Sequence, residues 1–178
     1  MKTRKKIRLQ SWDYRNQGIY FITILTKDRF HYFGEIQDGM SILSRQGKIA
    51  AECWFGLSGH FNGLTFHDFV VMPNHIHALL EMDGNCHSKI SAVDVRSGHD
   101  PTLQSAGDDQ VKRASLSTII GCYKSAVSKL IRREGLHFEW HRSFYDVIVR
   151  TEDAFLKISN YIHQNPQSWE NDKFFIKE

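Results

Sequence analysis

The stretch Gly18-Ile-Tyr-Phe-Ile-Thr-Ile-Leu-Thr26 decides the fold. It is rich in β-branched and aromatic residues, which favour a buried β-strand. Two further apolar runs, residues 64–72 and 75–82, are separated only by Pro73-Asn74, a dipeptide typical of a turn. A tight turn there makes these two strands antiparallel neighbours. Residues 144–149 supply a fourth strand, so the sequence predicts an antiparallel sheet.

Three helices are predicted between and after these strands. The first covers residues 44–57, where apolar side chains recur at near-helical spacing. The second has the strongest helical periodicity in the chain, and Gly135 ends it. Its apolar stripe consists of Leu116, Ile119, Ile120, Tyr123, Val127, Leu130 and Ile131. The third starts after Thr151, a good N-cap, and stops before Pro166. This order of elements predicts an α+β fold.

Length and composition indicate one globular domain over residues 1–178. We expect a basic tail at 1–8 and a flexible insertion at 84–110, where the sequence is polar and lacks periodicity. No apolar run approaches the ~18 residues of a membrane span, and no apolar signal core follows the basic tail. The three cysteines, an odd number, argue against a disulfide scaffold. These features predict a cytoplasmic protein.

Positive charge gathers in two parts of the chain, although the net charge is only +3. Five cations fall within the first eight residues, and residues 112–150 contain eight cations against three anions. This distribution suits a polyanionic partner such as nucleic acid. The candidate DNA-binding cations are Arg4, Lys5, Lys6, Arg8, Lys124, Lys129, Arg132, Arg133 and Arg142. Trp140 and Tyr145 could stack on bases or could equally pack in the core.

His75 and His77 form the first candidate site. Residues i and i+2 of a strand point to the same face, so the two imidazoles could bind one divalent ion. Two ligands are too few for a closed metal site, so further ligands would have to come from elsewhere. The alternative is a pair of histidines on the solvent face of an edge strand.

The second candidate site lies in the last helix. Tyr161 and Asn165 are i and i+4, so they share one face of that helix. A tyrosine hydroxyl becomes a nucleophile when a cation or a base lowers its pKa, or when the electrophile is polarised. Asn165, or Gln164 from the neighbouring face, could complete a metal coordination sphere. The alternative is that Tyr161 is a half-buried packing residue.

Together, a two-histidine metal face, a helix with a tyrosine and an amide, and a basic context suit phosphodiester transfer. The metal would polarise a phosphate oxygen, and the tyrosine would attack phosphorus in line and form a phosphotyrosine.

The motifs resemble those of a known family. Met72-Pro-Asn-His-Ile-His-Ala-Leu-Leu80 resembles the His-hydrophobic-His signature of single-tyrosine transposases. Tyr161-Ile-His-Gln-Asn-Pro166 resembles the Tyr-Ile-x-x-Asn-Pro helix of their REP-associated tyrosine transposase branch. Trp140-His-Arg-Ser-Phe-Tyr-Asp146 lies where that branch has its Trp-x-x-x-Phe-x-Asp/Glu stretch. The resemblance extends from about Arg8 to Trp169.

The resemblance implies a ferredoxin-like antiparallel sheet, and we expect the helices to pack on one face of it. It implies that His75 and His77 bind Mg²⁺ or Mn²⁺ with Asn165 as the third ligand and Gln164 as the backup. It also implies that Tyr161 nicks single-stranded DNA beside hairpins through a 5′-phosphotyrosine and then transfers the strand. DNA transposition of this kind predicts a protein that associates with the nucleoid when bound to DNA.

Two other classes of function stay open at this point. One is a domesticated, non-catalytic protein of the same fold that binds DNA or RNA hairpins. The other is a small metalloenzyme that acts on a small molecule through His75 and His77. The sequence also leaves open a monomer or a homodimer, in which a partner subunit could supply the tyrosine helix.

Overall fold

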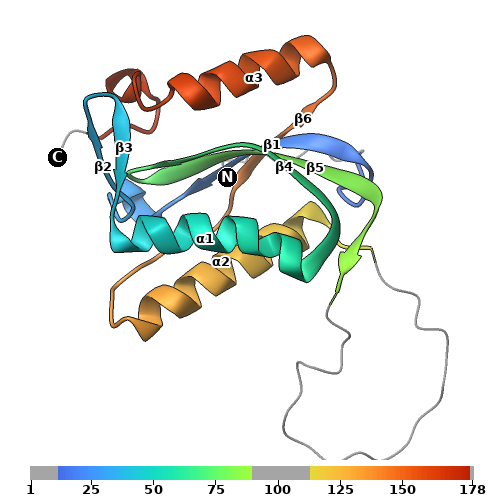
Figure 1. Cartoon of the computed structure of the whole chain (residues 1–178), viewed down its shortest axis with the longest axis horizontal. Helices are drawn as coiled ribbons and strands as arrows, with labels where there is room; N and C mark the ends of the chain where they lie inside the picture. The colour runs from blue at the N-terminus through green and yellow to red at the C-terminus, as the bar shows by residue number, and fades with distance from the viewer. Residues whose placement is uncertain (1–11, 90–112, 177–178) are drawn as a thin grey trace, which may run out of the picture.

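The computed structural model describes residues 12–89 and 113–176 (Figure 1). The strands are β1 (Gly18–Leu25), β2 (Gly34–Gln37), β3 (Met40–Leu43), β4 (Phe61–Met72), β5 (His75–Ser88) and β6 (Tyr145–Val149). The helices are α1 (Arg45–His60), α2 (Leu116–Arg133) and α3 (Glu152–Gln164). The three helices and the strands of the main sheet follow the predicted order, and two short strands, β2 and β3, lie in addition between β1 and α1. Short 3-10 turns cover Lys27–Arg29 and Trp169–Asn171.

Four strands form one antiparallel sheet in the order β4-β5-β1-β6. The Pro73-Asn74 turn joins β4 to β5 and pairs Met72 with His75, which confirms the predicted hairpin. In a β-α-β-β-α-β chain, this strand order is the ferredoxin-like arrangement, so the predicted α+β class is confirmed. β2 and β3 form a separate two-stranded sheet.

α1 and α2 cover one face of the sheet, and the main hydrophobic core lies between them and the strands (Figure 1). Side chains alternate along β1, so Tyr20, Ile22 and Ile24 all point to this face and are fully buried. Trp54 of α1 stacks on Phe69 of β4 with ring centroids 5.4 Å apart. This face therefore contains most of the apolar packing of the described residues.

α3 lies on the opposite face of the sheet (Figure 1). The Thr151 hydroxyl accepts a hydrogen bond from the Ala154 amide at 3.2 Å, as expected for an N-cap. Ile162 packs with Leu79 and Val149 in a second, smaller buried cluster. The expectation that the helices pack on one face holds for α1 and α2, whereas α3 is on the other. The reason is that β5 and β6 also expose apolar side chains on that face, which the apolar stripe of α3 covers.

β5 runs further along the chain than predicted. Residues 84–88 were expected to begin the flexible insertion, but they continue β5, where Ser88 pairs with Phe61 and His87 pairs with Asn62. The reason is that β4 begins directly after α1 and gives this end of β5 a partner strand. Residues 90–110 of the expected insertion and the basic tail at 1–8 lie outside the described residues. Within the described ranges, no helix combines the length and apolar character needed to cross a membrane.

Candidate active site

His75 and His77, here called the histidine pair, lie on the face of the sheet that α3 covers. Both imidazoles are fully buried, and their Nε2 atoms lie 3.0 Å apart, so the two rings converge on one point. Because β1 and β4 flank β5, the pair is on a central strand. The alternative of two solvent-facing histidines on an edge strand is therefore wrong.

The other ring nitrogen of each histidine has its own partner. Nδ1 of His75 lies 2.8 Å from Oδ1 of Asn74, which is an acceptor, so Nδ1 carries the proton and Nε2 keeps its lone pair. Nδ1 of His77 lies 2.9 Å from the Thr23 hydroxyl. Metal-binding histidines are usually oriented by such a contact at the nitrogen that does not face the metal. With these contacts at Nδ1, the Nε2 atoms are the ring nitrogens that face the point shared by the two histidines.

Burial keeps the histidine pair neutral at pH 7. It lowers the pKa of His75 to about 3, and the positive charge of Lys173 contributes to the lowering. Burial also lowers the pKa of His77 well below its ordinary value, and the neighbouring His75 lowers it further. Neutral imidazole is the form that binds metals, so both side chains are in the state that a cation requires.

α3 brings Tyr161 into contact with this pair within one subunit. Its hydroxyl lies 3.2 Å from Nε2 of His77 and donates a hydrogen bond to Oδ2 of Asp172 at 2.9 Å. The side chain is 39% exposed, so Tyr161 is not a core packing residue. Burial of the hydroxyl and the negative charge of Asp172 raise the pKa of Tyr161, so the phenol is protonated at neutral pH.

Asp172 belongs to the site although the sequence did not single it out. Its Oδ1 accepts a hydrogen bond from the Phe174 amide at 2.6 Å, and its Oδ2 also accepts one from Nδ2 of Asn165 at 3.1 Å. Its carboxylate and the histidine pair offer ligand atoms that all lie within 4.8 Å of one another. Asp172 follows the turn at Trp169–Asn171, so no helical or strand periodicity connects it with Tyr161.

The two predicted amide ligands occupy different environments. Asn165 is 2% exposed, and its buried Oδ1 has no hydrogen-bond partner among the described residues. The amide nitrogen of Asn165 contacts Asp172, and a buried amide oxygen without a partner is a donor that a divalent ion could use. Gln164 is exposed. Of the two, Asn165 therefore fits a ligand role better than the backup residue.

The residues after α3 cover the histidine pair. The Phe174 ring lies 5.0 Å from the His75 ring and 6.3 Å from the His77 ring, measured between centroids. Its backbone carbonyl accepts a hydrogen bond from Nδ2 of Asn74 at 3.0 Å. This segment explains why the imidazoles are buried while the Tyr161 side chain beside them is partly exposed.

Most of the candidate DNA-binding cations are remote from this site. Lys124, Lys129, Arg132 and Arg133 lie on α2, which packs on the opposite face of the sheet (Figure 1). Lys124 is half-buried and donates to the His141 carbonyl at 2.6 Å, so it is held by the protein itself. The cations Arg4, Lys5, Lys6 and Arg8 lie outside the described residues, and Arg142 is exposed next to β6.

The two aromatic candidates for base stacking also differ. Trp140 packs against the main core, and its indole nitrogen donates to the Lys124 carbonyl at 3.1 Å. Tyr145 is 37% exposed at the start of β6. Only Tyr145 of these two therefore offers a ring to a ligand.

His163, next to the tyrosine in sequence, ties α3 to the edge of the sheet. Its Nε2 lies 2.7 Å from Oδ1 of Asp68 on β4. Asp68 falls within an irregularity of the β4–β5 pairing between Phe66 and Phe69, and such bulges redirect side chains. The contact between His163 and Asp68 anchors the turn of α3 that carries Tyr161. Sequence reasoning did not detect this contact.

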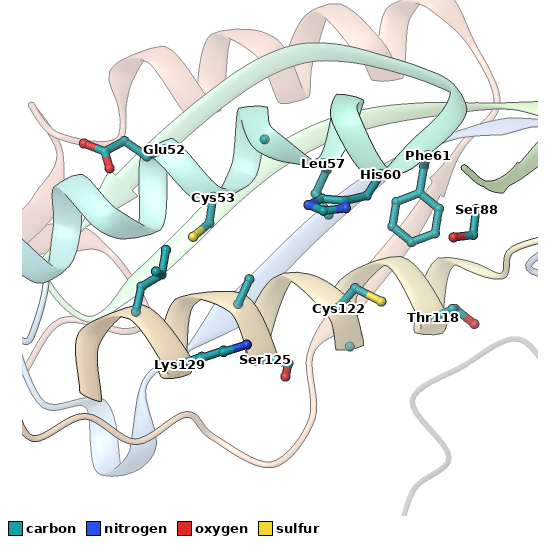
Figure 2. A pocket seen from close by; sticks show the side chains of 14 residues that line it. Glu52, Cys53, Leu57, His60, Phe61, Ser88, Thr118, Cys122, Ser125 and Lys129 are labelled. Carbon is teal, nitrogen blue, oxygen red and sulfur yellow. The ribbon is translucent and has the colours of Figure 1, made fainter. Parts of the chain in front are cut away.

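A cavity of about 880 Å³ lies between α1 and α2, away from this site (Figure 2). Cys53 and Leu57 of α1 and Cys122 of α2 point into it (Figure 2). None of the predicted catalytic or metal-binding residues lines this cavity, because α1 and α2 lie across the sheet from Tyr161.

Comparison with known sequences finds a relative of this chain. No protein-family model matches the chain. A protein of Haemophilus influenzae, described only as uncharacterized, is 30% identical over 178 residues, which cover 97% of this chain and 93% of the relative. The chain belongs to the same family as this protein.

Solved structures identify the fold. A REP-associated tyrosine transposase bound to a REP hairpin matches with a TM-score of 0.58 and 16% identity, over 96% of this chain and 77% of that chain. The chain therefore has the fold of this transposase. A protein of Deinococcus radiodurans, described as a candidate transposase, matches with a TM-score of 0.39 and 15% identity, over 87% of this chain and 94% of that chain. That likeness is too weak to carry an argument.

Proposed function

We propose that the protein is a transposase that nicks single-stranded DNA at hairpins and transfers the cut strand, with Tyr161 as the nucleophile. The observation that carries the proposal is the 3.2 Å contact between the Tyr161 hydroxyl and Nε2 of His77. This contact supports a nucleophile beside a cation site, which phosphoryl transfer needs. The shared fold also supports the proposal, since the transposase of known structure is described as bound to a REP hairpin.

The histidine pair and Asp172 would hold the metal, with Oδ1 of Asn165 as a fourth donor. The close spacing of the first three groups and the unpartnered Asn165 oxygen support this set. When bound, Mg²⁺ or Mn²⁺ supplies positive charge that polarises a phosphate oxygen. Two imidazole ligands favour Mn²⁺, because Mg²⁺ prefers oxygen ligands and retains its water.

The tyrosine itself carries the covalent step. Its oxygen attacks phosphorus, the bond from phosphorus to the 3′ oxygen breaks, and a 5′-phosphotyrosine and a 3′-hydroxyl result. Asp172 accepts the hydrogen bond of the Tyr161 hydroxyl at 2.9 Å and so orients it. The phenol proton passes to water, and the 3′ oxygen takes a proton from water, so that the protons balance. The 3′-hydroxyl can later attack the phosphotyrosine, so strand joining needs no external energy source.

Access to the histidine pair requires a movement of the C-terminal residues. Both imidazoles are fully buried under Phe174 and its neighbours, whereas a phosphate needs to reach the space in front of Nε2. Binding of the DNA strand would displace the Phe174 ring and leave the sheet, α3 and Tyr161 in place.

A covalent-adduct assay tests the proposal. The protein is incubated with a hairpin oligonucleotide from the flank of its own gene, with Mn²⁺ or with EDTA. We expect a protein–DNA adduct with the metal, none with EDTA, and none for Tyr161→Phe, which should bind the hairpin almost as well as the wild-type protein. An adduct that persists in Tyr161→Phe would contradict the assignment of the nucleophile.

A second candidate function is hairpin binding without catalysis. The complete burial of the histidine pair favours it, because a covered site cannot receive a phosphate. It predicts hairpin binding with no adduct in Mn²⁺, both for the wild-type protein and for Phe174→Ala, which uncovers His75. An adduct in the wild-type protein would exclude it.

A further inference from the structure

A second cavity lies directly beside the histidine pair. Its volume is about 330 Å³, and we call it the side cavity. It is formed by the end of β1, the turn after it, the start of β6 and the C-terminal residues. Its lining residues are Leu25, Thr26, Asp28, Arg29, His141, Tyr145, Phe174 and Ile176. Its volume is at the lower end of the range for small-ligand sites.

The pairing of the strands fixes where this cavity lies relative to the histidines. Leu25, which lines it, pairs with His75 across β1 and β5. Thr23 pairs with His77 on one side and with Tyr145 on the other, so these three residues form one row across the sheet. Paired residues share a face, and strands are about 4.8 Å apart, which puts Tyr145 roughly 10 Å from His77 on the same face.

The Phe174 ring separates the side cavity from the histidine pair. It lies 5.0 Å from the His75 ring and 6.3 Å from the Tyr145 ring. The displacement of Phe174 that a phosphate requires would therefore join the side cavity to the metal site. The joined space would extend from the histidine pair to the Tyr145 ring.

The lining of the side cavity combines a flat ring with polar groups. Tyr145 supplies a partly exposed aromatic surface, and such surfaces stack on bases without regard to sequence. Arg29 and His141 can donate hydrogen bonds, and Asp28 can accept them. A nucleobase has a flat face and an edge of donors and acceptors, so it matches both kinds of group.

We propose that the side cavity binds the base of the nucleotide next to the scissile phosphate, with Tyr145 as its stacking surface. This inference rests on the proposed function, because it takes the histidine pair as the phosphate position. Stacking there would hold the phosphate in line with Tyr161 and would select the strand that emerges unpaired from the hairpin. A base within the duplex of the hairpin cannot enter the side cavity, because its faces are stacked on the neighbouring bases.

Oligonucleotides that lack single bases test the proposal. A hairpin with a single-stranded tail is prepared as a series in which each tail nucleotide in turn is abasic. Binding to the wild-type protein, Tyr145→Phe and Tyr145→Ala is measured. We expect Tyr145→Ala to bind the complete oligonucleotide about ten- to a hundred-fold more weakly, and Tyr145→Phe to bind it almost normally.

The abasic series then locates the stacked base. At one tail position, the missing base should weaken binding to the wild-type protein by about the same factor as Tyr145→Ala does. The same missing base should not weaken the binding of Tyr145→Ala any further, because the stacking contact is already absent. Val147→Ala is the matched control, because Val147 is exposed two residues further along β6 and does not line the side cavity. Its binding should be unchanged.

The possible outcomes separate this inference from the proposed function. The role of Tyr145 would be overturned if, at every tail position, the effect of the missing base and the effect of Tyr145→Ala on the binding free energy were additive. It would also be overturned if Val147→Ala weakened binding as much as Tyr145→Ala. Both results hold whatever the adduct assay shows. An absence of any Tyr161-dependent adduct would overturn the nicking activity, and the coupling between Tyr145 and one base would still be measured by binding alone.

Discussion

The two faces of the sheet differ in what they bury. The face under α1 and α2 is closed by large apolar side chains such as Trp54 and Tyr123, which pack edge to face. The face under α3 has a small apolar cluster around Ile162, and beside it lie the buried imidazoles of the histidine pair. Buried polar groups reduce stability unless they are paired, so the first face stabilises the domain, whereas the second carries the residues of the proposed active site.

Truncation of the core tryptophan should have the largest effect on stability. Trp54→Ala removes a fully buried ring that contacts Phe69 and Tyr123, and we expect a loss of about 3–5 kcal/mol in the free energy of unfolding. Urea unfolding followed by circular dichroism measures it, with Tyr161→Phe as the control on the other face. A comparable loss in the control would show that the two faces do not divide their roles in this way.

Acid should destabilise the protein through the α3 face. Both histidines have a lowered pKa when folded, so below pH ~6.5 the unfolded chain binds protons that the folded chain does not. Stability is therefore retained above pH 6.5 and is lost as the pH falls toward 3. For His75, whose folded pKa is about 3, this loss is about 2 kcal/mol between pH 6.5 and 5, and His77 adds a loss of the same sign.

Urea unfolding at pH 7, 6 and 5 measures this loss. A variant with His75→Asn and His77→Gln should show a much flatter dependence on pH. An equally steep loss in this variant would assign the acid sensitivity to other groups.

Mn²⁺ should offset part of the instability of the same face. An ion that binds only the folded chain stabilises it by about 2.7 kcal/mol at a hundred times its dissociation constant. Thermal melting with and without Mn²⁺ should show a higher Tm in the wild-type protein and no shift in His77→Ala. Trp54→Phe, altered on the other face, should keep the full shift. A Tm increase that survives in His77→Ala would place the ion elsewhere.

Removal of the contact between α3 and β4 should have the smallest effect. His163→Ala removes the contact with the Asp68 carboxylate, and the histidine side chain is 66% exposed, so we expect a loss of at most about 1 kcal/mol. The rate of adduct formation should nevertheless fall, because the contact holds the turn of α3 that carries Tyr161. Lys157→Ala, an exposed change on the same helix, serves as the control. Equal rates in both variants would remove the positioning role of His163.

Local patterns in the sequence were sufficient to predict the main elements and four residues of the candidate site. The alternation around His75 and His77 predicted a shared face, and the i, i+4 spacing predicted that Tyr161 and Asn165 lie together. Asp172 was missed because it lies in an irregular segment, where no periodicity connects it to its neighbours in space. The α2 cations were predicted from charge alone, which carries no information on the face of the sheet to which they belong.

The sequence by itself determined the strands of the main sheet, the three helices and the Thr151 cap, because hydrophobic periodicity and capping depend on residues within a few positions of one another. Only the tertiary structure decided that α3 crosses the sheet opposite α1 and α2. It also decided that Tyr161, Asp172 and Phe174 contact the histidine pair, and that Tyr145 lies in the same cross-strand row as His77. These contacts join segments that are far apart in the chain, and the distances between the side chains follow from the packing of the whole domain.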